Sequence, residues 1–140
     1  MRFGEMEHHG RKLRKNATWE EIQAFEKRAE KQSLTTELAW VIEWIKATYY
    51  YRKQDYKNSH KHYSSAFELG KYTAGQLQYL LVNQYVESCA KTENLVKFKK
   101  GVAWAKYIGL EIRFIRDKPE TEEVLEFAYT MLKFGNYPIH

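Results

Sequence analysis

Apolar residues recur with helical spacing along most of the chain. In residues 19–31 they lie three or four positions apart, at Trp19, Ile22, Phe25 and Ala29. This period places them on one face of an α-helix, with charged side chains on the other. Thr18 and Glu21 fit a capping box that would begin this helix. No segment shows sustained two-residue alternation, so the pattern predicts an all-α protein without a β-sheet.

The same pattern predicts about six helices. Their expected ranges are 19–31, 36–53, 55–70, 73–91, 95–116 and 119–134. Gly70 can close the third helix in a left-handed conformation, and Pro119 suits the first turn of the sixth. Short connections make consecutive helices antiparallel neighbours. We therefore expect three stacked pairs in one helical domain over residues 18–134, followed by a short C-terminal tail at 135–140.

The first 17 residues show no clear apolar period. They carry five positive charges against two negative ones, and Phe3, Met6 and Leu13 are spaced without an obvious face. We expect a flexible basic tail that can be removed without loss of the fold. Its positive charges are Arg2, Arg11, Lys12, Arg14 and Lys15.

Composition places the chain among folded proteins of ordinary size. It has 140 residues, 16 % of them aromatic, and a formal net charge of +5. Cys89 is its only cysteine, so no internal disulfide can form, and we expect a reducing, cytoplasmic location. No apolar run approaches the ~20 residues that cross a bilayer, so no membrane span is expected.

Small and aromatic residues around the second and third helices are spaced to interlock. Small side chains there allow two antiparallel helices to approach closely, and the aromatic ones fill the remaining space. The residues are Ala47, Tyr50, Ser59, Tyr63 and Ala66. In this pattern the stretch resembles a tetratricopeptide repeat (TPR), although Glu43, Lys46 and Lys71 stand where the family has tryptophan, leucine and proline. A second, less regular unit can be aligned from Tyr85 through Gly101, Ala105 and Ile108.

The resemblance implies a short right-handed superhelix that binds a peptide or protein partner in a concave groove. In the family, residues left free by packing face that groove, and an asparagine and an arginine often contact the ligand. Asn83 and Arg52 match those positions. A simpler interpretation also stays open, in which Trp44 and Tyr51 belong to the core and Arg52 and Asn83 to the surface. The groove set that the resemblance implies is Trp44, Thr48, Tyr51, Arg52, Tyr79, Asn83 and Glu87.

Sequence motifs of catalysis are missing. The chain has no glycine-rich phosphate loop, no HExxH and no GxSxG. His60 and His62 lie on different faces of one helix, and Cys89 has no histidine near it in sequence. We therefore expect a protein that is not an enzyme, with no metal and no cofactor.

Two other functions compete with peptide binding. One is nucleic-acid binding through the basic tail and the fifth-helix lysines Lys97, Lys99, Lys100 and Lys106. The other is homo-oligomerisation, for example as a homodimer, through Trp19, Trp40 or Phe134 in a regulatory segment of a longer protein.

Overall fold

The computed structural model describes residues 3–72 and 78–135. Within these ranges the chain forms seven α-helices and no β-strand, which confirms the all-α class. The helices are α1 (Phe3–Asn16), α2 (Trp19–Lys31), α3 (Ala39–Arg52), α4 (Tyr56–Gly70), α5 (Gln78–Lys91), α6 (Leu95–Tyr107) and α7 (Glu122–Phe134).

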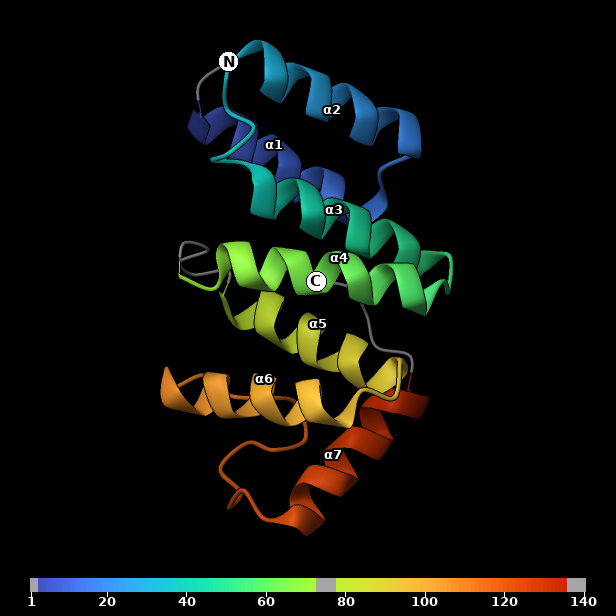
Figure 1. Ribbon diagram of the computed structural model, residues 1–140, viewed down its shortest axis with the longest axis vertical. Helices are drawn as coiled ribbons and strands as arrows, with labels where there is room; N and C mark the ends of the chain where they lie inside the picture. Colours follow the sequence, from blue (N-terminus) through green and yellow to red (C-terminus); the bar gives the residue numbers. More distant parts are fainter. Residues whose placement is uncertain (1–2, 73–77, 136–140) are drawn as a thin grey trace.

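The helices stack in layers (Figure 1). α2 lies at one end of the stack and α7 at the other, with α1 between α2 and α3. From α3 to α6 each helix packs on the next in chain order, and α7 packs on both α5 and α6. None of the described helices is long and apolar enough to cross a membrane.

One turn geometry joins α3 to α4 and α5 to α6. Gln54 and Glu93 take positive φ angles of 59° and 58°. The following residue, Asp55 or Asn94, donates its N–H to a carbonyl of the preceding helix, Tyr50 O at 3.0 Å or Cys89 O at 2.8 Å. Its side chain then caps the next helix. The two helix pairs are therefore built on the same local plan.

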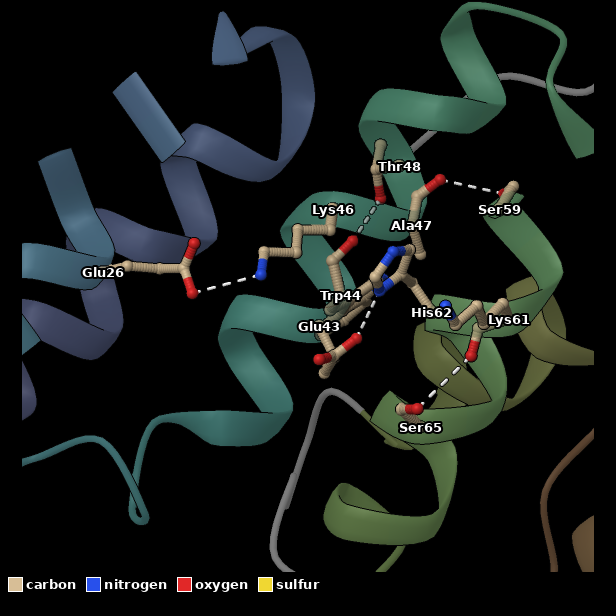
Figure 2. A network of polar contacts seen from close by, with 10 residues as sticks. All are labelled: Glu26, Glu43, Trp44, Lys46, Ala47, Thr48, Ser59, Lys61, His62 and Ser65. Carbon is tan, nitrogen blue, oxygen red and sulfur yellow. Dashed lines mark hydrogen bonds and ion pairs between the residues drawn. The ribbon is translucent and has the colours of Figure 1, made fainter. Parts of the chain in front are cut away.

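The interlocking residues lie at the crossing of α3 and α4, as predicted. Ser59 Oγ donates to the carbonyl of Ala47 at 2.9 Å, and Tyr63 and Ala66 are also buried. Figure 2 shows this crossing, together with His62 facing Glu43 at 2.5 Å. Small residues at the crossing thus bring the two backbones together.

Residues 3–16 form helix α1, so the expectation of a flexible tail is wrong. Met6, Leu13 and Ala17 are buried on one face of this segment. Gly10 lies between them, where an added Cβ would stand 2.6 Å from Val41 Cγ1. The apolar stripe was hard to recognise because it is short, is interrupted by glycine and is surrounded by charged residues.

The segment between α6 and α7 also differs from the prediction. α6 ends at Tyr107, because Gly109 adopts a φ of 78° and the N–H of Leu110 turns back to Ala105 O at 2.7 Å. Ile112 and Ile115 are nevertheless buried, outside any helix. Pro119 precedes the N-cap Thr121 and does not belong to α7. The predicted start of the fourth helix at residue 73 and nearly all of the C-terminal tail lie outside the described residues.

Candidate binding cleft

A basic cleft lies between α1 and α5. Its volume is about 420 Å³. Six of its lining residues come from α1 and one from α5, and none of these described residues is acidic. Four carry a full positive charge, so the cleft concentrates positive potential. We call it the α1–α5 cleft; its lining residues are His8, Arg11, Lys12, Arg14, Lys15, Asn16 and Leu80.

Arg14 is the buried member of this set. Its side chain and backbone together are only 5 % exposed. The guanidinium lies over the indole of Trp44, 4.8 Å from the ring centroid, and its Nε and Nη1 have no hydrogen-bond partner among the described residues. Burial lowers the pKa of Arg14 from its usual value, but an arginine stays charged at neutral pH. The cleft therefore contains a buried cation that lacks a carboxylate partner in the described part of the chain.

Arg52 fixes the C-terminal end of α1 beside this cleft. Its guanidinium donates to Arg14 O at 3.0 Å, Lys15 O at 2.9 Å and Ala17 O at 2.7 Å. Helix ends leave such carbonyls without intrahelical partners, and a cation is favoured there. These donors hold α1 against α3, and contact of Arg52 with a partner stays a prediction.

Trp44 and Thr48 are buried, not open in a groove. Trp44 is 1 % exposed, because Arg14 covers its ring and its Nε1 donates to Gln84 Oε1 at 2.6 Å. Thr48 is fully buried, and its hydroxyl donates to Trp44 O at 2.9 Å and lies 3.4 Å from Tyr63 Oη. The predicted exposure of both side chains is thus wrong, because α1 covers α3 on this side.

Tyr51 of α3 is partly buried and Glu87 of α5 is buried, although the Tyr51 hydroxyl has no hydrogen-bond partner among the described residues. Glu87 is 8 % exposed and lies 3.8 Å from Arg113 Nη1. Burial raises the pKa of Glu87, while its contacts with Tyr51 and Arg113 oppose that shift. Burial also raises the pKa of Tyr51, and the nearby Glu87 raises it further. Glu87 is thus turned toward the protein's own Arg113, and its predicted place in an open groove is wrong because the side chain is buried.

Asn83 holds the segment that follows α6. Its Nδ2 donates to Glu111 O at 3.0 Å, and its Oδ1 accepts from Arg113 N at 2.9 Å. The Asn83 side-chain amide thus binds the protein's own backbone, whereas the repeat resemblance predicts that it binds the backbone of a peptide ligand. Of the seven predicted groove residues, Tyr79 alone is classed as exposed, with 42 % of its surface accessible.

A second basic cleft adjoins Tyr79. It has a volume of about 450 Å³ and is lined by Tyr79, Arg113, Phe114, Arg116 and Lys118. Arg116 pairs with Glu111 at 3.0 Å. Tyr79 and Leu80 are consecutive residues of α5, so each basic cleft meets α5 in its first turn.

The two side chains that could suggest a catalytic nucleophile, Ser88 and Cys89, are buried. His60 Nδ1 lies 3.0 Å from Ser88 Oγ, a pairing that resembles an activated nucleophile. Ser88 is only 2 % exposed, however, and its hydroxyl donates to Tyr85 O. Burial raises the pKa of the Cys89 thiol to about 12, so that thiol is held protonated. Among the described residues, no group of three or more potential ligands could hold a metal ion.

The residues of the α1–α5 cleft were only partly found from sequence. Arg11, Lys12, Arg14 and Lys15 were named for nucleic-acid binding but assigned to a flexible tail. The signal that places them on a helix is the buried series Met6, Gly10, Leu13 and Ala17, whose members lie three or four residues apart. Of the fifth-helix lysines, Lys99 pairs with Glu122 and Lys106 with Glu120, and none lines this cleft.

Comparison with family models, curated proteins and solved structures gives no match.

Proposed function

We propose that this protein is a non-catalytic helical-repeat module that resembles the TPR family and binds an acidic segment of a protein partner in the α1–α5 cleft. The observation that carries the proposal is the concentration of four cationic side chains, without a described acid, in one hollow between two helices. Complementary charge would favour and orient an acidic ligand there.

The shape of the cleft also suits a chain segment. The inner helix α3 connects its two sides, because Trp44 of α3 contacts both Arg14 of α1 and Gln84 of α5. Leu80 offers one apolar contact among the charges. The repeated turn at Gln54 and Glu93 supports the repeat-like part of the proposal.

Single-stranded nucleic acid is the second candidate ligand. Tyr79 favours it, because an exposed aromatic ring that lines the second basic cleft is a surface on which a base can stack. Homo-oligomerisation through Trp40 has less support, since that side chain is 5 % exposed, whereas Phe134 is 73 % exposed.

Fluorescence anisotropy can separate these ligands. The probes are a labelled peptide rich in Glu, Asp and Leu, and a single-stranded RNA of similar length and charge. The proposal predicts that the peptide binds more tightly. A triple variant in which Arg11, Lys12 and Lys15 become Gln should lose that binding.

The matched control removes the same charge elsewhere. It changes Lys27, Lys31 and Lys100, all exposed and outside the cleft, to Gln. Peptide binding that falls equally in both triple variants would reject the cleft as the site. Tighter binding of RNA, lost in the cleft variant and weakened by Tyr79→Ala, would support the second candidate.

A further inference from the structure

We propose that Arg14 anchors a phosphate site in the α1–α5 cleft, and that the group bound there is a phosphate monoester on a side chain of the partner segment. The inference rests on the proposed function for the place of binding. It adds the chemical group that is recognised.

The unpartnered burial of Arg14 is the first support. A buried guanidinium is normally paired, because removing a charge from water costs free energy that a counter-charge must offset. Arg14 is 5 % exposed, yet the described residues supply no carboxylate within ion-pair distance and no hydrogen bond to its Nε or Nη1. The ring of Trp44 is a weaker partner for a cation than an anion. An anion in the cleft would complete this site.

The four positive charges of the α1–α5 cleft favour an anion that carries more than one negative charge. Arg11, Lys12 and Lys15 line the cleft with Arg14, and none of the four pairs with a described carboxylate. A phosphate monoester carries about 1.5 to 2 negative charges at neutral pH and three acceptor oxygens. A carboxylate or a phosphodiester carries about one. The monoester therefore balances more of the charge in the cleft, and arginine is well suited to phosphate oxygens.

The helix end alone does not explain this arrangement. Cations near the C-terminus of a helix interact favourably with its dipole, which accounts for Lys15 at the surface. The helix dipole gives no reason for Arg14 to be buried over Trp44. The carbonyls at the end of α1 do not need Arg14 either, because Arg52 already donates hydrogen bonds to them.

The indole N–H of Trp44 is a local reporter for the test. It donates to Gln84 on one side, while Arg14 covers the ring. In a ¹⁵N-labelled sample the signal of the Trp44 indole N–H can be assigned, because it is the indole signal that disappears in the Trp44→Phe variant. The probes are inorganic phosphate, then a peptide with one phosphoserine, and the same peptide with Ser or Glu in its place. Chloride at matched ionic strength is the blank.

The expected result is a saturable shift of the Trp44 signal with inorganic phosphate, and tighter binding of the phosphoserine peptide than of its Ser and Glu versions. Arg14→Met should weaken the phosphoserine peptide about tenfold or more, since a charge-assisted hydrogen bond would be lost. Arg14→Lys should weaken it less. Lys31→Gln, which removes an exposed charge on α2, should leave it unchanged.

Methionine is chosen because it can fill the buried position without a charge, so the variant should stay folded. If the Arg14→Met variant nevertheless unfolds, the Arg14→Lys variant and the comparison of the three peptides still test whether Arg14 binds phosphate. Equal affinity for the phosphoserine and Glu peptides would overturn the inference, as would a shift of the Trp44 signal that chloride reproduces. Binding of the Glu peptide alone would overturn the phosphate inference but leave the proposed function intact. A response to inorganic phosphate without binding of any peptide would reject the proposed function but keep Arg14 as part of a phosphate site.

Discussion

The guanidinium of Arg14 lies 4.8 Å from the ring centroid of Trp44 and covers it. This contact joins α1 to the inner helix α3. It buries the aromatic side chain that the repeat pattern places in an open groove, and it puts a cation there instead. The binding surface that we propose is therefore made largely by α1, with α3 beneath it.

Deletion of residues 1–17 should destabilise the protein. Met6 and Leu13 would be lost from the core, and burial of each such side chain contributes about 1.5–3 kcal/mol. We expect a loss of roughly 3–6 kcal/mol in the free energy of unfolding, a large part of the stability of a small domain. Urea denaturation followed by circular dichroism measures it. An unchanged midpoint would mean that α1 does not pack on the body.

Two glycines of α1 should respond oppositely to alanine. At Gly10 the new Cβ would stand 2.6 Å from Val41 Cγ1 and 2.9 Å from Phe25 Cζ, so overpacking should cost about 1–3 kcal/mol. At Gly4 a new Cβ would meet no described atom within 4 Å beyond its chain neighbours and its own helix backbone, so alanine should stabilise the protein through its helix propensity, by at most about 0.5–1 kcal/mol. Thermal unfolding of both variants compares them directly. Equal effects of the same sign would contradict the close approach at Gly10.

Arg52→Leu should weaken the attachment of α1. The change removes donors to three carbonyls at the end of that helix, and a hydrogen bond from a charged donor contributes about 1.5–3 kcal/mol. We expect a destabilisation of at least this size, with faster amide hydrogen exchange in α1. Lys53→Leu, at the next and exposed position, is the control. A variant with normal exchange in α1 would show that Arg52 serves the surface, as the repeat pattern suggested.

Stability should fall below about pH 6.5, the usual histidine pKa. Burial lowers the pKa of His60, and Lys97 lowers it further; burial and Arg28 lower that of His9. The unfolded chain then binds more protons than the folded one between the lowered pKa values and 6.5. The stability that the two neutral histidines contribute is complete above pH 6.5, and it is lost as the pH falls through their pKa values in the folded protein. Urea midpoints measured across this pH range should fall less steeply in His60→Gln than in the wild type. The same slope in the wild type and the variant would refute the assignment of this pH dependence to His60.

The sequence was sufficient where local signals and packing agree. The capping box of Thr18 and Glu21 begins α2 as predicted, with both reciprocal bonds present. The small residues Ala47 and Ser59 lie at the crossing of α3 and α4, as their spacing predicts.

The candidate site was less predictable, because it depends on which helix covers which face. Periodicity places Trp44 and Thr48 on one side of α3, but it does not tell that α1 packs there. Asn83 and Arg52 have the chemistry to bind a ligand's backbone or acid, and the protein uses that chemistry on its own carbonyls and amide. Only the three-dimensional neighbours distinguish these uses.

Charge reversal in the cleft tests the central claim most directly. In one variant Arg11, Lys12 and Lys15 become Glu; in the control the exposed Lys27, Lys31 and Lys100 become Glu. Both variants are titrated with the acidic peptide and with a lysine-rich peptide of the same length, with folding checked by circular dichroism. The account predicts that the cleft variant loses the acidic peptide and binds the basic one, while the control keeps the preference of the wild type. Retention of the acidic peptide by the folded cleft variant would contradict the proposal that this cleft is the binding site.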